Sequence, residues 1–246
     1  MSNDHFVPEF YLKRWVGHDK RIVAFQNNSI KGIICDRHTP KHTGYEEELY
    51  QDVEEGFFKP LDDSSSKILS ELEREHEKTI NLHPKEYKLN EKHITWAKFI
   101  LGFIVRIPKQ INFIKEYCGN AGISEGEALK QIPRIISSPN AIKDLRQLTW
   151  VFSDVKSNVP LLTSDNPLIF EPNSLKSPSC VIILPLSPRH FFLATSKDNL
   201  SRLEANSTKM VKHINREIVG QASRYVYASA EHDVEKRFLE KHLKKA

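Results

Sequence analysis

The spacing of apolar residues along the chain changes near residue 148. Before that point several stretches repeat at helical intervals, and after it short apolar runs alternate with turn residues, a pattern typical of strands. The strongest helical pattern begins at Glu91 and ends at about Tyr117. Its apolar residues recur at i, i+3, i+4, i+7 and i+8, and they are Trp96, Phe99, Ile100, Phe103 and Ile104. We therefore expect a core helix here, interrupted where Pro108 removes a backbone donor.

The remainder of the first 147 residues is also predicted to be mostly helical. Pro8 suits the first turn of a helix, and the aromatic residues that follow it indicate a terminus docked on the core. The predicted elements are a helix over 8–15, a hairpin over 22–26 and 31–36, and helices over 45–61, 64–82, 124–136 and 141–146.

After residue 148 the pattern favours a sheet followed by further helices. Strands are expected over 149–153, 160–163, 168–170, 181–184 and 191–194, then a helix over 207–223, a strand over 224–228 and a helix over 231–245. Short links between the strands indicate mostly antiparallel pairing. The predicted fold class is therefore α+β, with a helical N-terminal two thirds packed on a mostly antiparallel sheet. We expect one domain over 1–246, helix-rich over 1–147 and sheet-rich over 148–246.

Composition places the chain among cytoplasmic globular proteins. It is 39% hydrophobic, which is enough for a core. The longest apolar run, Ile100 to Val105, is far below the roughly 20 residues needed to span a membrane, and the first residues lead us to expect no secretory signal. The short apolar run also leads us to expect no membrane partner. The three cysteines are widely spaced, so we expect reduced thiols.

The formal net charge of +4 is unevenly distributed. Acidic residues dominate from Gly44 to Glu75, and basic residues dominate from Arg189 to the C-terminus. This asymmetry predicts a metal-binding rim beside a surface for a polyanion such as RNA or DNA. The alternative is that each segment is only a solvated helix face.

The candidate site is centred on Thr163-Ser164-Asp165-Asn166-Pro167, which lies between two apolar runs. An ordinary turn needs an Asx residue and a proline, but not four polar residues in a row. This density of hydroxyl, carboxylate and amide groups indicates a binding or catalytic rim.

Two further glutamates are candidate metal ligands together with Asp165. If the chain is helical over 45–61, Glu47 and Glu54 lie two turns apart on one face, where they would hold a divalent cation such as Mg²⁺. The alternative is that both are solvated. A zinc site at Cys35, His38 and His42 has weaker support, because no fourth ligand is evident.

Arg106 follows the apolar face of the central helix and precedes the break at Pro108. A guanidinium in such a place needs a carboxylate, a carbonyl or a phosphate as its partner. A structural pair with a helix glutamate and a role in binding phosphate are both open alternatives.

Several motifs occur in a fixed order along the chain. They are His5-Phe6-Val7-Pro8 with Phe10-Tyr11-Leu12, Arg106-x-Pro108, Thr163 to Pro167, Pro185-Leu186-Ser187-Pro188, and Asn215 followed by Ala222-x-Arg224-Tyr225-Val226. In this combination the chain resembles the prokaryotic domain-of-unknown-function family 4238. The resemblance implies a one-domain architecture and marks positions, but it implies no reaction. No G-x-S-x-G, P-loop, G-x-G-x-x-G or H-E-x-x-H motif is present.

Our functional hypothesis is a hydrolase of phosphodiesters in RNA or DNA. His5 would act as general acid or base, Asp165 as base or metal ligand, Arg106 as the phosphate clamp and Asn166 as an orienting amide. A toxin or defence role rests only on the habits of small prokaryotic families. The alternative is a non-enzymatic module that binds nucleic acid or protein and in which the same polar residues are structural.

Overall fold

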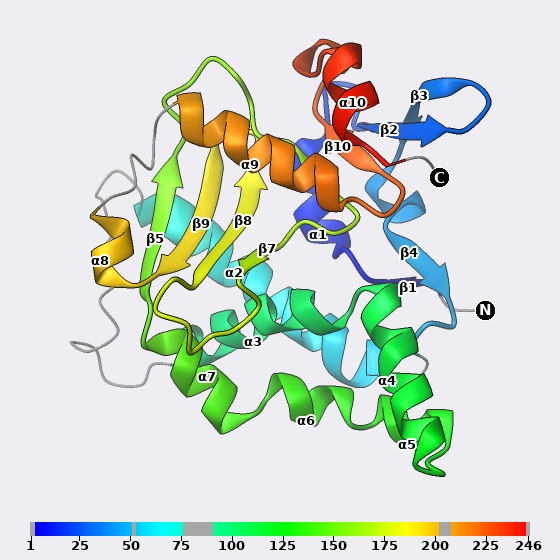
Figure 1. Cartoon of the computed structure of the whole chain (residues 1–246), viewed down its shortest axis with the longest axis vertical. Coiled ribbons are helices and arrows are strands. Elements are labelled where there is room, and N and C mark those ends of the chain that lie inside the picture. Colours follow the sequence, from blue (N-terminus) through cyan, green and yellow to red (C-terminus); the bar gives the residue numbers. More distant parts are fainter. Residues whose placement is uncertain (1–2, 51–52, 76–90, 202–207, 245–246) are drawn as a thin grey trace.

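The computed structural model describes residues 3–50, 53–75, 91–201 and 208–244 (Figure 1). Side chains of residues 72–75 and Asn3 are not described. The predicted helix over 64–82 lies partly outside the described residues.

Over the described residues, short strands and helices come first, then a run of helices from α2 to α7, then a run of strands from β5 to β9. The α-helices are α1 (Glu9–Leu12), α2 (Lys59–Glu75), α3 (Glu91–Val105), α4 (Pro108–Asn120), α5 (Glu125–Leu129), α6 (Ile132–Ile136), α7 (Pro139–Arg146), α8 (Lys197–Leu200), α9 (Thr208–Gln221) and α10 (Lys236–His242). Short 3₁₀-helices cover Lys13–Trp15, Pro40–His42 and Glu231–Asp233, and a π-helix covers Glu54–Phe58. The strands are β1 (Asn3–His5), β2 (Ile22–Asn28), β3 (Gly32–His38), β4 (Tyr45–Glu47), β5 (Thr149–Asp154), β6 (Thr163–Ser164), β7 (Ile169–Glu171), β8 (Val181–Ser187), β9 (His190–Thr195) and β10 (Val226–Ala228).

A four-stranded antiparallel sheet of order β5-β9-β8-β7 divides the interior into two apolar cores. Successive residues of a strand point to opposite faces, so both faces of this sheet are apolar. Ile182 and Leu184 of β8 pack in the core shared with α1, α3, α6 and α7, whereas Ile183 packs in the core shared with α9. Figure 1 shows α9 crossing in front of this sheet.

A second antiparallel sheet joins the two ends of the chain, in the order β3-β2-β10-β6. Val226 of β10 lies opposite Phe25 of β2 on one side and Ser164 of β6 on the other. The sheet therefore connects the N-terminal hairpin to the polar stretch at Asp165.

The α+β fold class and the antiparallel pairing are confirmed, with one change in the first part of the chain. The N-terminal region adds strands to the second sheet and forms a separate pair, β1 with β4. The expectation of one domain over residues 1–246 stays a prediction.

The helix predicted over 45–61 is wrong in its first half. Tyr45 lies opposite His5 in the β1–β4 pair, so the backbone is extended there. Among the described residues of this segment, helical structure is present from Val53, passes through the π-helical turn at Glu54–Phe58 and continues into α2. The long-range strand pairing outweighs the helical propensity of this acidic segment, as tertiary contacts commonly do.

The break at Pro108 is confirmed and is sharper than a kink. Ile107 is extended, with φ −67° and ψ 143°, and Pro108 begins a new helix. This is the arrangement that proline favours at the first helical position. No helix in the described part of the chain has both the length and the apolar character needed to cross a bilayer.

Candidate functional site

A cavity of about 400 Å³ lies where four of the ordered motifs meet. Phe6 comes from the first motif, Pro108 from the second, Asp165 from the third, and Ser223, Arg224 and Tyr225 from the last. Segments more than 200 residues apart in sequence thus share one small space. We call this space the motif pocket.

The carboxylate of Asp165 holds the wall of the motif pocket in place. It accepts hydrogen bonds from three successive backbone N–H groups, those of Ser223 (2.8 Å), Arg224 (2.6 Å) and Tyr225 (3.0 Å). Asp165 is only 4% exposed. Burial raises the pKa of its carboxyl group above the ordinary value, against the opposite effect of the three donors.

The side chains that Asp165 positions are Arg224 and Tyr225. The Arg224 guanidinium lies 4.8 Å from the centroid of the Tyr225 ring, a distance suited to a cation–π contact. Tyr225 also meets the His38 ring edge-to-face at 6.0 Å and stacks on Tyr227 at 6.1 Å. Arg224 is exposed, so its charge is available to a ligand.

Two histidines from the end of β3 and the following 3₁₀-helix also line the motif pocket. His42 is exposed, and its Nδ1 forms a 2.8 Å hydrogen bond with Thr39 Oγ1. That bond fixes the ring and leaves Nε2 directed elsewhere. His38 Nε2 is buried, and no hydrogen-bond partner for it exists among the described residues.

Asn166 lies behind the pocket wall. Its Nδ2 donates to the Gln221 carbonyl (3.3 Å), and Gln221 Nε2 donates to the Asn166 carbonyl (2.7 Å). This exchange fastens the turn after β6 to the last residue of α9. The Asn166 amide, predicted to orient a substrate, is therefore bonded to the backbone of Gln221.

His5 supports the opposite wall. Its ring lies 5.7 Å from that of Tyr45, its partner in the β1–β4 pair, and Tyr45 lines the pocket. Gly44 completes this wall at φ +67°, where a Cβ atom would lie 3.1 Å from both Leu12 and Val7. A side chain is excluded there by both conformation and space.

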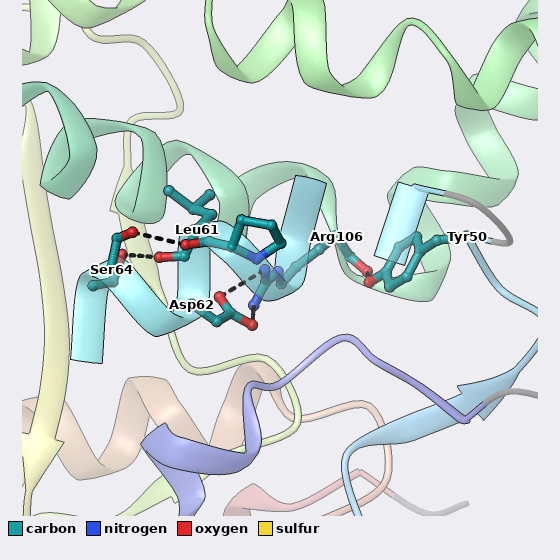
Figure 2. A network of polar contacts seen from close by, with 7 residues as sticks. Tyr50, Leu61, Asp62, Ser64 and Arg106 are labelled. Atoms are coloured by element: carbon teal, nitrogen blue, oxygen red, sulfur yellow. Dashed lines mark hydrogen bonds and ion pairs between the residues drawn. The ribbon is translucent and has the colours of Figure 1, made fainter. Parts of the chain in front are cut away.

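Arg106 is buried at 1% exposure, and its partner is Asp62 of α2 (Figure 2). Nη2 donates to Asp62 Oδ1 at 3.0 Å and Nη1 donates to Oδ2 at 3.3 Å. The guanidinium also lies 4.3 Å from the centroid of the Phe58 ring. The structural alternative is thus the one observed, with a helix aspartate in place of the glutamate.

The backbone of Arg106 is anchored as well, since its carbonyl accepts the Tyr50 hydroxyl (Figure 2). These bonds fix the chain immediately before Ile107 and Pro108. They therefore fix the start of α4 and the exposed Lys109, which lines the motif pocket.

Glu54 lies near Arg106 and is 5% exposed, with Oε2 lacking a hydrogen-bond partner among the described residues. Burial raises the pKa of Glu54 to about 7, although the Arg106 charge opposes the shift. Burial also raises the pKa of Asp62 to about 6 despite its pairing with Arg106. Both acids therefore take up protons more readily than they would in water.

The predicted metal ligands do not form one group. Glu47 is exposed on β4, Glu54 is buried beside Arg106, and Asp165 is bound to backbone amides. Glu47 and Glu54 do not share a helix face, because the chain between them is not a continuous helix. Within the ranges that the structure describes, no three His, Cys, Asp or Glu side chains are placed to hold a metal ion, and this includes Cys35, His38 and His42.

Sequence reasoning marked the backbone supports of the pocket and missed most of its exposed side chains. His38 and His42 entered only as zinc ligands, and Arg224 only as part of a family motif. Lys109 follows the Arg106-x-Pro108 motif directly, so its position was a usable signal. No feature of the sequence singles out Tyr45.

The first helix connects the motif pocket to the remaining motif. The Tyr11 hydroxyl forms 2.7 Å hydrogen bonds with Thr163 Oγ1 and with the Pro185 carbonyl. All five ordered motifs are therefore linked by contacts at or next to one cavity.

Comparison with known proteins identifies the family of the chain. Residues 3–134 and 125–232 match the family described as "Protein of unknown function (DUF4238)". No curated protein and no solved structure matches the chain. The resemblance drawn from the ordered motifs is confirmed, and the chain belongs to the DUF4238 family.

Proposed function

We propose that the motif pocket binds a phosphodiester of RNA or DNA and hydrolyses it. The single observation that carries the proposal is the convergence of four family motifs on one cavity that presents two imidazoles, a guanidinium and an ammonium group. Imidazoles can transfer protons, and guanidinium and ammonium groups can stabilise the negative charge of a phosphoryl group during hydrolysis.

Each group has a role in the proposed reaction. Arg224 and Lys109 bind the non-bridging oxygens and stabilise the charge that develops on them. One imidazole accepts the proton of the attacking water or hydroxyl, and the other donates a proton to the leaving oxygen. The P–O bond to the leaving group breaks as the new P–O bond forms, so no redox partner is needed.

The wall behind these groups supplies positioning. Asp165 orients the backbone that carries Arg224, and the Arg106–Asp62 pair fixes the start of α4 before Lys109. Aromatic faces at Tyr45 and Tyr225 offer surfaces on which a base stacks. The roles first assigned to Asp165 and Arg106 thus become indirect in this proposal.

A second candidate function is a non-enzymatic module that binds nucleic acid at the same pocket. The mixed charge of the lining weighs against catalysis, because Glu46, Glu47 and Asp165 offset Lys109 and Arg224 and leave little positive charge to stabilise a developing oxyanion. The second candidate is also favoured by the engagement of Asp165 with backbone amides. A toxin or defence role stays a prediction under either function.

End-labelled RNA and DNA incubated with the purified full chain test the proposal. The reactions run in EDTA, in Mg²⁺ and in Mn²⁺, with wild type, His42→Gln and Arg224→Gln. The matched controls are His18→Gln and Arg237→Gln, since both residues are exposed and neither lines the pocket.

We expect cleavage by wild type and both controls, and a loss of about 10²-fold or more in each pocket variant. Binding without cleavage in every chain would support the second candidate. Cleavage only with Mg²⁺ or Mn²⁺, unaffected by His42→Gln, would assign the proton transfer to a cation-bound water. Neither binding nor cleavage of any substrate would remove both functions.

A further inference from the structure

A second and larger cavity, of about 760 Å³, lies between the segment before β6, helix α9 and the C-terminal segment that contains α10. We call it the α9–α10 cleft. Its size is within the range of small-molecule sites, about 300–1,000 Å³. None of its lining residues belongs to the motif pocket.

The α9–α10 cleft is at the other end of the short β6–β10 pair. The motif pocket adjoins Asp165 and Tyr225, which lie at one end of these antiparallel strands. The cleft instead adjoins Leu162, which precedes β6, and residues 232–235, which follow β10. A ligand in one cavity therefore leaves the other open.

The cleft combines positive charge with an apolar floor. Arg189, Lys212 and Arg216 supply three cationic side chains, and all three are exposed. Arg216 also lies 3.5 Å from Glu217 Oε1 through Nε and 2.9 Å from His213 Nδ1 through Nη2, so Glu217 offsets part of its charge. Two acids also line the cleft, but Asp233 accepts a hydrogen bond from the Ala230 N–H, which offsets part of its charge. The lining thus carries a net positive charge before any contribution from its two histidines.

Hydrogen bonds to the backbone hold two lining residues of the cleft, Arg189 and Asn215, in place. Arg189 Nη1 donates to the Ser157 carbonyl. Asn215 bridges α9 to the segment before β6, because its Oδ1 accepts from Leu162 N–H (2.9 Å) and its Nδ2 donates to the Pro160 carbonyl (2.9 Å). The cleft wall is therefore held by one buried and two partly buried hydrogen bonds.

The apolar part of the cleft includes an aromatic ring. Phe238 of α10 lines it, and the ring lies 4.9 Å from that of His242. A flat ring system can stack on such a pair while its anionic group meets the cations of α9.

We propose that the α9–α10 cleft binds a mononucleotide, with its phosphate on Lys212 and Arg216 and its base on Phe238. Cations alone would accept any anion, and the adjacent aromatic surface selects one that carries a flat ring. This second site does not depend on the function proposed for the motif pocket.

Calorimetric titration of the full chain with AMP, adenosine and inorganic phosphate tests this proposal. We expect AMP to bind most tightly, and Lys212→Gln and Arg216→Gln to weaken AMP about tenfold each, as loss of a charged phosphate contact implies. Phe238→Leu should weaken AMP and leave phosphate unchanged. Lys209→Gln is the matched control, because Lys209 is exposed on α9 outside the cleft.

Arg224→Gln separates this site from the motif pocket, and we expect it to leave AMP affinity unchanged. Loss of AMP binding in Arg224→Gln but not in Lys212→Gln would place the nucleotide in the motif pocket and overturn the proposal. Absence of AMP binding, or equal affinity for AMP and adenosine, would overturn it as well. Failure of nucleic-acid cleavage would leave these outcomes unaffected.

Discussion

Replacement of Asp165 by asparagine isolates the role of its carboxylate while keeping size and turn propensity. In wild type, Oδ1 accepts the Ser223 N–H, and Oδ2 accepts the N–H groups of Arg224 and Tyr225. Asparagine offers one acceptor oxygen and places an NH₂ group in the other position. One backbone donor then faces a donor, and the two remaining bonds lose their charge assistance.

The cost follows from these three bonds. An unsatisfied buried donor costs about 1–3 kcal/mol, and loss of charge assistance in the other bonds adds about 1 kcal/mol. We expect Asp165→Asn to lower the free energy of unfolding by about 2–4 kcal/mol, with the lower value applying if water reaches the exposed Ser223 amide. For a chain of this size, that corresponds to a fall of about 4–16 °C in Tm.

Urea unfolding and thermal melts followed by circular dichroism measure this change. Asp36→Asn is the control, because Asp36 is exposed on β3. An unchanged Tm in Asp165→Asn would refute the reasoning, since it would show that the carboxylate does not hold the segment before β10. Loss of nucleic-acid binding or cleavage with an unchanged Tm would return Asp165 to a direct role in the site.

Three further outcomes follow from the buried polar groups. Glu54→Gln should stabilise the protein by about 2–3 kcal/mol at pH 8 and by much less at pH 5. Because the pKa of Glu54 is raised to about 7 in the folded protein, the protonated side chain favours folding below about pH 4.5, and that contribution is lost as the pH rises through 7. Equal shifts of the urea midpoint at both pH values would contradict this. Asp62→Asn should cost about 3–5 kcal/mol by leaving the Arg106 charge buried, and Asp62→Leu combined with Arg106→Met should recover most of that loss; a double variant as unstable as Asp62→Asn would count against the pair as the cause. Asn215→Leu should cost about 2–4 kcal/mol and speed hydrogen exchange at the Leu162 amide, and unchanged exchange there would show that the bridge is not needed.

The fold could be predicted where one physical signal dominated. The apolar face of the α3 region recurs at helical spacing, and β8 and β9 are short apolar runs bounded by turn residues, so local sequence pattern alone identified them. The strand at Tyr45 could not be found in this way. Its extended conformation depends on pairing with the residues around His5, and no local pattern records that contact.

The same contrast applies to the site, where the sequence indicated the buried polar residues but not the exposed ones. A polar residue inside an apolar sequence signals burial with a partner, and this argument located Arg106, Asp165 and Asn166 correctly as buried or fastened groups. It could not name the partners, because Asp62 and the residue 223–225 amides lie far away in sequence. Exposed groups such as Arg224 leave no such signal, since an exposed arginine is ordinary in any sequence.

The position of β10 has a consequence for synthesis of the chain. Strand β2 ends at Asn28, but its partner β10 begins at Val226, so about 200 residues are made between them. At about 5–20 residues per second, one edge of β2 waits about 10–40 s for its partner. That edge belongs to a strand with four consecutive apolar residues, Ile22 to Phe25, and such an edge pairs readily with other chains. A nascent chain that stops before Val226 should therefore aggregate through its N-terminal hairpin, and chaperone contact should concentrate there during translation.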